Sequence, residues 1–274
     1  MAEGGDQTFS GVETLTVNPA KVMFREKDLI GRGGYGLVYR ATDDGIHYDD
    51  NVVVKKIRKT NFESQLLKYL KPMYKRMYAN VERSFRNEVM AQERFSHKAI
   101  SPRVFYVNYD EMYYVMEKMD QTLGEMIREN EFTPERANKL IDLLERSFST
   151  NYIHKDLSTE NVMWSDKDDD FRLIDWGMFI LRKDVKDPRM RSVINDGLIW
   201  ILQWMFKFLT DKDPEKWSTV HGRFLQFVRD NCFYDDEEKC LVFSPKYADS
   251  STPEGNVRIE NNIKGCLLYT SPSP

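Results

Sequence analysis

Apolar and polar positions follow a strand-like pattern in the first part of the chain. Short β-branched or apolar runs between polar or glycine-rich turns predict strands at residues 28–39, 52–54, 104–109 and 112–117. A glycine cluster interrupts the first run, which predicts a strand, a tight turn and a second strand there. Residues 62–95 have a polar helical pattern that Pro72 divides into two helices. We therefore expect the first 120 residues to be mostly strands with helix between them.

The second part is predicted to be mainly helical. Thr133 and Pro134 supply an N-cap and a first helical residue for a helix that runs to about Ser149. Short strands at 162–164 and 171–174 flank an acidic turn, which lacks the central glycine and distal glutamate of a calcium loop. Apolar residues predict a buried helix over 195–209 and another around 224–228, and beyond Phe243 the chain becomes polar and irregular.

Composition narrows the protein class. The chain has 274 residues, of which 41% are hydrophobic and 31% charged, and this composition is typical of a globular protein rather than a disordered one. A net charge of −4 does not indicate nucleic-acid binding. The longest apolar stretch, 198–209, is too short to span a bilayer, and residues 1–16 lack the apolar region of a signal peptide. Three cysteines, Cys232, Cys240 and Cys266, form neither a disulfide framework nor a zinc motif, so we expect a reducing, cytoplasmic location without membrane contact.

The glycine cluster has a phosphate-binding pattern. Gly31, Gly33, Gly36 and Val38 fit G-x-G-x-x-G-x-V, and glycines let backbone amides approach phosphate closely. A strand follows the glycines instead of a helix, which argues against a dinucleotide fingerprint. Taken alone, the pattern is equally compatible with a glycine-rich hairpin.

Two charged residues downstream fit the same chemistry. Lys55 ends a strand near the glycines and can reach nucleotide phosphates, and Glu88 on a helix can hold that lysine through an ion pair. Lys56 and Glu93 are rivals for these roles by position alone.

The most specific motif runs from His154 to Asn161 and is followed by Asp175, Trp176 and Gly177. Phosphoryl transfer needs a carboxylate to orient the attacking hydroxyl, a role that Asp156 fits. It also needs oxygen ligands for Mg²⁺, which Asn161 and Asp175 supply. We interpret His154 as a packed structural histidine. The sequence indicates no ion-pair partner for Asp175, so its removal is expected to affect turnover more than folding.

In this order the motifs resemble the eukaryotic-like protein kinase superfamily from Phe24 to Phe243. The resemblance implies an α+β fold with two lobes, in which a small antiparallel sheet precedes a mainly helical, abbreviated lobe. It implies ATP and Mg²⁺ as cofactors and a protein substrate. It assigns catalysis to Lys55, Glu88, Asp156, Asn161 and Asp175, the last two as metal ligands.

The same resemblance predicts an adenine pocket. Residues 115–119 look like the kinase hinge, with Met116 as gatekeeper and the backbones of Glu117 and Met119 bonding the adenine. Ile30, Val38 and Val53 would line the pocket, and Asp196 resembles the aspartate that braces the catalytic loop.

Several positions depart from the family pattern. Ser158 replaces a lysine that is usual in serine-specific kinases and resembles the serine of RIO-type atypical kinases and some small-molecule kinases. Lys155 replaces the loop arginine. The interval from Gly177 to Asp196 is short, lacks Ala-Pro-Glu and contains Ser192 as its one hydroxyl residue. Activity is therefore predicted not to need phosphorylation there. This compactness resembles kinases of large DNA viruses.

The expected organisation is a flexible leader (1–20), a sheet lobe with the hinge (21–119), a helical lobe (120–245) and an irregular tail (246–265). The final string, CLLYTSPSP at 266–274, resembles the translation of a sequencing adapter, so we expect the native sequence to depart near Gly265. We interpret the basic stretch 56–76 as a solvated insertion, with docking of an acidic partner or of nucleic acid as the alternative.

Three functions remain open on the sequence. The favoured one is a Ser/Thr protein kinase that uses Mg-ATP. A small-molecule phosphotransferase is supported by Ser158, and a catalytically silent binding module is the third. The binding module is disfavoured because no lysine or metal position has been lost.

Overall fold

The computed structural model of the protein describes the greater part of its two predicted lobes. The described residues are 23–32, 36–43, 46–47, 51–57, 81–154, 156–177, 179–181, 201, 204–205, 208–209, 211–235 and 240–243. None of the helices in these ranges has the length and apolarity that a membrane-spanning segment needs. The leader 1–20, the tail beyond 243, Gly33, Ser192 and Asp196 lie outside them.

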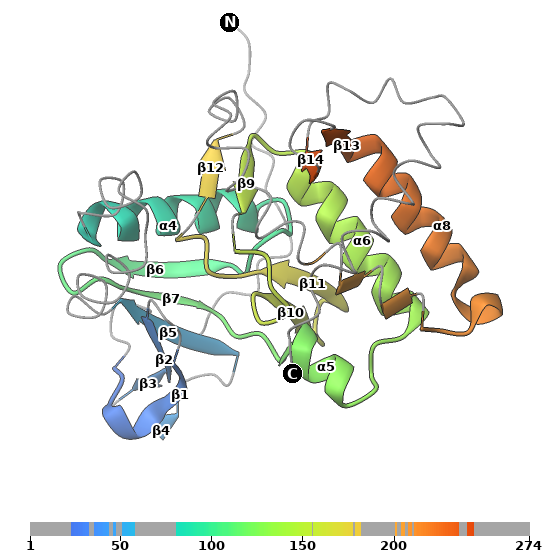
Figure 1. The fold of residues 1–274 in the computed structure, drawn as a ribbon. Coiled ribbons are helices and arrows are strands. Elements are labelled where there is room, and N and C mark those ends of the chain that lie inside the picture. The colour runs from blue at the N-terminus through green and yellow to red at the C-terminus, as the bar shows by residue number, and fades with distance from the viewer. Residues whose placement is uncertain are drawn as a thin grey trace, which may run out of the picture.

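Five strands form one antiparallel sheet in the order β1-β2-β5-β7-β6 (Figure 1). Their bounds are β1 (Leu29–Arg32), β2 (Gly36–Arg40), β5 (Val52–Ile57), β6 (Val104–Asn108) and β7 (Tyr113–Glu117). The short 3-10 helix η2 (Glu26–Asp28) precedes β1, and β3 (Thr42–Asp43) pairs with β4 (Ile46–His47). Strand β5 is the central strand, and apolar clusters cover both of its faces, a position that its run of valines suits.

Helix α4 (Val81–Ser96) covers one face of this sheet, and Figure 1 shows it lying over β6. Val53, Ile57 and Met116 of the sheet pack with Phe85 and Val89 of the helix. The residues between these alternate to the opposite face, where they form a second apolar cluster that contains Tyr39, Val54 and Val115. The period of two along β5 and β7 therefore decides which side chains meet α4.

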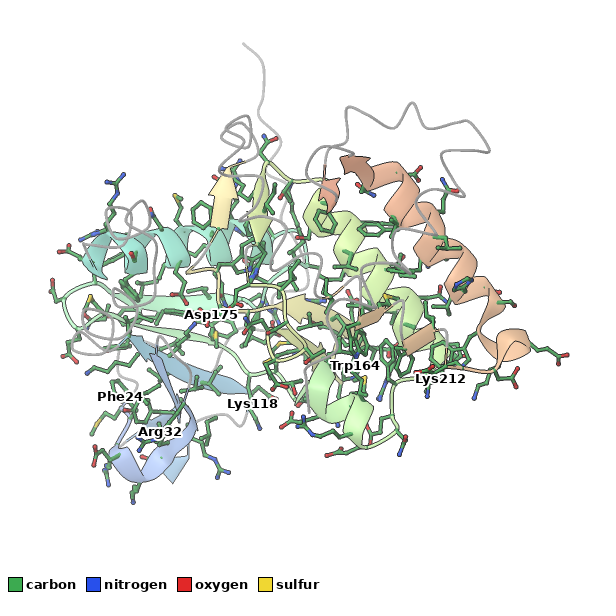
Figure 2. All side chains as sticks on the ribbon, in the orientation of Figure 1. Phe24, Arg32, Lys118, Trp164, Asp175 and Lys212 are labelled. Carbon is green, nitrogen blue, oxygen red and sulfur yellow. The ribbon has the colours of Figure 1, made fainter. Side chains whose placement is uncertain are left out.

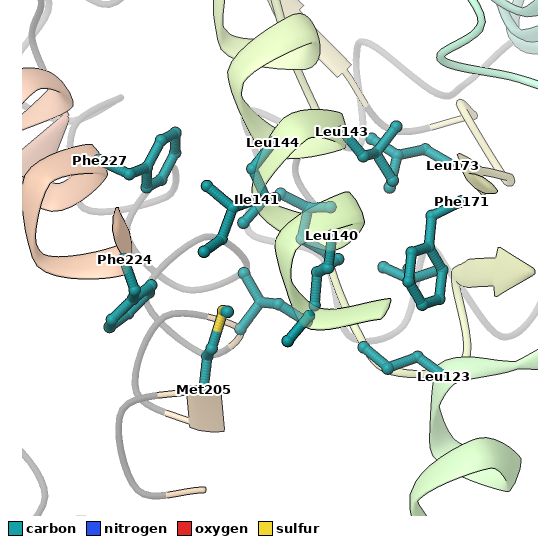
Figure 3. Packing of buried hydrophobic residues seen from close by; sticks show 14 of the residues in the cluster. Leu123, Leu140, Ile141, Leu143, Leu144, Phe171, Leu173, Met205, Phe224 and Phe227 are labelled. Carbon is teal, nitrogen blue, oxygen red and sulfur yellow. The ribbon is translucent and has the colours of Figure 1, made fainter. Parts of the chain in front are cut away.

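The other half of the molecule is built around α6 (Pro134–Phe148). Thr133 caps this helix by accepting a hydrogen bond from Arg136 N, and Pro134 occupies its first turn. Its buried positions, among them Leu140 and Leu144, repeat at the spacing of one helix face. Figure 3 shows this face between two groups of side chains: Phe224 and Phe227 lie on one side, and Phe171, Leu173 and Leu123 on the other.

Short strands and the helices α5 and α8 belong to the same half. Their bounds are β8 (Gln121–Thr122), α5 (Leu123–Arg128), β9 (Tyr152–His154), β10 (Val162–Ser165), β11 (Asp170–Leu173), β12 (Phe179–Leu181), α8 (Pro214–Asn231), β13 (Cys232–Asp235) and β14 (Cys240–Phe243). The strands pair as β11-β10-β8, β12-β9 and β13-β14.

The predicted fold class is confirmed: an antiparallel sheet lobe precedes a lobe rich in helices. The predicted strands at 52–54, 104–109 and 112–117 are present, the first extended to Ile57. Of the predicted helical stretch 62–95, the described part is α4. Of the predicted helix 195–209, the described residues include Ile201, Met205 and Leu209, all buried in the core. The segments β8, α5, β9 and β12 were not predicted.

The acidic turn is confirmed as a turn between β10 and β11, but its carboxylates are paired with cations. Arg172 donates to Asp168 and Asp170, each at 2.8 Å, and Arg146 donates to Asp170 at 2.8 Å. These carboxylates stabilise the hairpin through ion pairs with arginine and do not form a calcium loop.

Candidate active site

Lys55 lies at the centre of a buried cluster of charges. Its Nζ is 2.5 Å from Glu88 Oε1 and 3.2 Å from Asp175 Oδ1, so strand β5, helix α4 and the segment after β11 meet at one ammonium group. Burial lowers the pKa of Lys55, but the carboxylates of Asp175 and Glu88 outweigh it and raise that pKa well above its ordinary value. Lys55 is therefore a fixed positive charge.

The rival residues are excluded from this cluster by their surroundings. Lys56 points to the other side of the strand, is about one-third exposed and pairs with Glu111 at 3.7 Å. Glu93 is exposed on α4, whereas Glu88 is 3% exposed. Successive side chains of β5 point to opposite faces of the sheet, and Lys55, unlike Lys56, lies on the face toward α4.

A tyrosine that the sequence analysis did not single out completes the cluster. Tyr114 on β7 is fully buried, and its hydroxyl donates to Glu88 Oε1 at 2.9 Å. The available signal was its position two residues before Met116, which places both side chains on the face of the strand toward α4.

The catalytic-loop residues are joined by hydrogen bonds. Asn161 Nδ2 donates to Asp156 O at 2.8 Å and to Asp156 Oδ2 at 3.1 Å. His154 is 1% exposed, its Nδ1 accepts from Asp156 N at 3.2 Å, and its Nε2 lies 2.9 Å from Ile174 O. The expectation of a packed structural histidine is thus confirmed, and the histidine links Asp156 to the strand end that carries Asp175.

Asp175 occupies a strained backbone position between the two lobes (Figure 2). Its φ is 62°, in the left-handed region that few residues other than glycine, asparagine and aspartate adopt. Ile174 N donates to Asn161 O at 3.0 Å, which brings Asp175 next to Asn161 in the fold. The expectation that Asp175 has no ion-pair partner is wrong, because Lys55 pairs with it over a separation of 120 residues.

Trp176 and Gly177, the two residues after Asp175, both lie against α4. The Trp176 ring is fully buried, with its centroid 4.3 Å from that of Phe95 and 4.7 Å from that of His154. A Cβ on Gly177 would lie 3.2 Å from Glu88 Oε2, closer than most real Cβ contacts. Gly177 lets the segment after β11 approach Glu88, and the buried Trp176 ring fixes this segment against α4.

The predicted glycine-rich turn falls between β1 and β2, and its described glycines, Gly31 and Gly36, lie in these strands. A Cβ on Gly36 would lie only 2.9 Å from the backbone oxygen of Lys56 on β5, so this position requires glycine. A Cβ on Gly31 would meet Val38 at an ordinary 3.5 Å. The remaining predicted glycine, Gly33, lies outside the described residues.

Most of the predicted adenine-pocket side chains share one face of the sheet. Val53 and Met116 are directly opposite each other in the β5–β7 register, and Val38 packs against the same cluster. Ile30 lies apart at an irregularity of β1 and is 45% exposed.

The predicted hinge, residues 115–119, covers the end of β7 and the two residues after it. Glu117 is held by Arg103, whose Nη2 is 2.9 Å from Glu117 Oε1, and Glu117 N donates to Arg103 O at 2.8 Å. Lys118 N donates to Asn51 O at 2.7 Å. Within the described part of the chain, no residue hydrogen-bonds the backbone N–H or C=O of Met119.

Comparisons with known proteins agree with this geometry. A family model for the protein kinase domain matches residues 24–196, which is more than half of the chain. Calcium-dependent protein kinase 5 of Plasmodium berghei (strain Anka) is 24% identical over 219 residues, covering 76% of this chain and 35% of the relative. Calcium-dependent protein kinase 5 of Plasmodium falciparum (isolate 3D7) is 23% identical over 199 residues, covering 69% of this chain and 31% of the relative.

The chain spans about one-third of the length of these curated relatives. The matched range includes the glycine turn, Lys55, Glu88, the loop from His154 to Asn161 and Asp175. On this match and on the fold that carries these residues, the chain belongs to the protein kinase domain family.

Proposed function

We propose that the protein is a kinase that transfers the γ-phosphoryl group of Mg-ATP to serine or threonine hydroxyls of a protein substrate. One observation carries this proposal: Lys55 is paired with Glu88 and Asp175 at the same time. Phosphoryl transfer in protein kinases needs both the lysine–glutamate pair and the metal-binding aspartate in place. The lysine would then hold the α- and β-phosphates.

The residues present fit ATP. Gly36 lies so close to β5 that a side chain there would collide with the backbone oxygen of Lys56. The backbone N–H and C=O of Met119, to which no described residue hydrogen-bonds, would offer one donor and one acceptor to an adenine edge. Met116 and Val53 would supply apolar contact for the base.

The residues also fit Mg²⁺. Within the described ranges no group of three or more His, Cys, Asp or Glu side chains is arranged to hold a metal ion. Mg²⁺ is usually bound by one or two protein oxygens together with substrate phosphates, and such a site needs no protein cage. Asp175 would offer a carboxylate oxygen, and Asn161 its amide oxygen, because Asn161 Nδ2 already donates to Asp156.

Mg-ATP would supply the phosphoryl group and neutralise the charge between its phosphates. The protein would position the acceptor: Asp156 orients the substrate hydroxyl and accepts its proton as the oxygen–phosphorus bond forms and the bond to ADP breaks. Asn161 holds the Asp156 carboxylate through Oδ2, and His154 holds the Asp156 backbone. The acid–base group is therefore fixed from two sides before substrate arrives.

The test is phosphate transfer from labelled ATP to a generic protein substrate, with Mg²⁺ and with EDTA. Asp156→Asn should lower turnover by about 10²–10⁴-fold, since it removes the proton acceptor. Asp175→Asn should lower turnover and raise the Mg²⁺ concentration required. Phosphoamino acid analysis should show phosphoserine or phosphothreonine.

Asp110→Asn is the matched control. This substitution makes the same chemical change away from the site, because Asp110 is exposed in the turn between β6 and β7. It should leave turnover unchanged. Transfer that survives both Asp156→Asn and Asp175→Asn would refute the assignment. Nucleotide binding without transfer to any acceptor would instead indicate a binding module.

A small-molecule phosphotransferase is the second candidate, favoured by Ser158 in place of lysine. Ser158 lies in the loop between Asp156 and Asn161, and its carbonyl accepts from Asn161 N at 3.1 Å. Transfer to sugars or amino alcohols, with none to proteins, would support this candidate over the first.

A further inference from the structure

A line of buried polar groups extends from the Lys55 ion pair into the packing between β7 and α4. Tyr114 donates to Glu88 Oε1 at 2.9 Å, and its hydroxyl lies 3.5 Å from Gln92 Oε1. Gln92 Nε2 in turn donates to Met116 Sδ at 3.2 Å. Glu88, Gln92 and Tyr114 are at most 3% exposed, so this line lies in the interior of the lobe.

Two elements that are distant in the sequence supply the line. Glu88 and Gln92 are four residues apart on α4 and therefore share a face of the helix. Tyr114 and Met116 are two residues apart on β7 and share the face toward that helix. The geometry thus joins the residues that hold the lysine to the predicted gatekeeper.

Burial makes the position of Glu88 depend on these partners. A buried polar group that loses its hydrogen bond costs free energy, and the cost is larger for a charged group. If α4 moved outward, Lys55 would lose one of its two carboxylates, and the Tyr114 hydroxyl would be left unpaired. Burial raises the pKa of Tyr114 well above its ordinary value, so the residue remains a neutral phenol that can donate.

We propose that Tyr114 is a positioning residue that acts through Glu88 and holds Lys55 in its phosphate-binding place from within the lobe. This positioning depends on the hydrogen bond from Tyr114 on β7 to Glu88 on α4. It therefore requires no modification of the segment after Gly177. The kinetic test of this inference rests on the proposed function, whereas the test by nucleotide-analogue binding does not depend on it.

Tyr114→Phe removes the hydroxyl and keeps the ring, which lies 6.2 Å from that of Phe85. We expect affinity for the non-hydrolysable analogue adenylyl imidodiphosphate with Mg²⁺ to fall about tenfold, and kcat/KM for ATP to fall similarly. The loss should appear in KM for ATP more than in kcat, because Tyr114 acts on the lysine that would bind the phosphates and not on Asp156.

Tyr113→Phe is the matched control. Tyr113 precedes Tyr114 on β7, and it packs on the opposite face of the sheet, away from Lys55. Tyr113→Phe also removes one hydroxyl, and it should leave nucleotide affinity and KM for ATP unchanged.

A double-mutant cycle separates positioning from general stabilisation. In a Glu88→Gln background, Tyr114→Phe should have little further effect on analogue affinity, because the tyrosine acts through the carboxylate. An equal effect in both backgrounds, or no effect in the wild type, would overturn the proposal. A protein that binds the analogue but transfers no phosphate would refute the proposed function and leave this cycle readable.

Hydrogen exchange gives a second readout that does not depend on the Glu88 variant. Tyr114→Phe should increase exchange of α4 amides near Glu88 about tenfold, while Tyr113→Phe should not. Unchanged protection of α4 in Tyr114→Phe would also overturn the proposal.

Discussion

His154 shows at the scale of one residue how burial fixes a protonation state. Desolvation lowers the pKa of His154 below its ordinary value of about 6.5, although the carbonyl of Ile174 and the nearby carboxylates oppose this shift. The neutral ring donates from one nitrogen and accepts from the other, and both bonds hold the catalytic loop. A protonated ring could not accept from Asp156 N.

This lowered pKa predicts a pH-dependent stability. Below about pH 6.5 the unfolded chain binds a proton at His154 that the folded chain does not, so the free energy of unfolding should fall as the pH falls. The slope should reach at most about 1.4 kcal/mol per pH unit until the folded pKa is passed. Urea denaturation between pH 7 and pH 5 measures it. His154→Gln should remove this part of the slope, and an identical slope in that variant would contradict the prediction.

At the scale of elements, the two described glycines of the turn have different surroundings. A Cβ at Gly36 would strike the backbone of β5, whereas a Cβ at Gly31 meets only ordinary contacts. Gly36→Ala should therefore lower the free energy of unfolding by about 1–3 kcal/mol, the usual cost of overpacking. Gly31→Ala should change it by no more than about 0.5 kcal/mol. Equal losses in the two variants, measured by urea denaturation, would show that the contact between β2 and β5 is not the cause.

Elements with local signals were the ones that the sequence predicted. Helix α6 begins at the expected residue because Thr133 and Pro134 specify a helix start without help from distant residues. Strands β9 and β12 were missed because each has three residues and their pairing, Ile153 with Ile180, joins distant segments. Their strand conformation depends on tertiary contact more than on propensity.

The same distinction applies to the site. The motif spacing indicated Lys55, Glu88, Asp156, Asn161 and Asp175 as one set, and the structure brings Lys55 to Glu88 and Asp175. The motif spacing could not reveal that Tyr114 donates to Glu88, since no local sequence pattern indicates which acceptor a buried hydroxyl will bond. Nor did it reveal the Asp175 ion pair, which depends on how the two lobes dock.

At the scale of the whole molecule, the lobes meet around Asp175 through polar contacts and through apolar packing, in which Phe95 of α4 lies against Trp176. Lys55 reaches it from the sheet, and Leu173 N donates to Ile100 O at 2.7 Å just before it. A ligand that bridges both lobes should therefore stabilise the entire fold, because it binds only the native arrangement.

Mg-ATP at about 100 times its dissociation constant should raise the free energy of unfolding by about 2.7 kcal/mol. Thermal melting with and without nucleotide measures the effect, and EDTA should remove much of it. Lys55→Met should reduce the shift, because the phosphates lose their cation. A full shift in the presence of EDTA would argue against metal-assisted binding.

The left-handed backbone at Asp175 limits which residues can replace it. Asparagine accepts this conformation readily and keeps an oxygen for Lys55, although it gives up the ion pair with that buried ammonium. Among replacements at this position, asparagine should thus be the least destabilising, while selection for phosphate transfer should restore aspartate. An evolving lineage that no longer needed a carboxylate at residue 175 would be expected to drift to asparagine before other residue types.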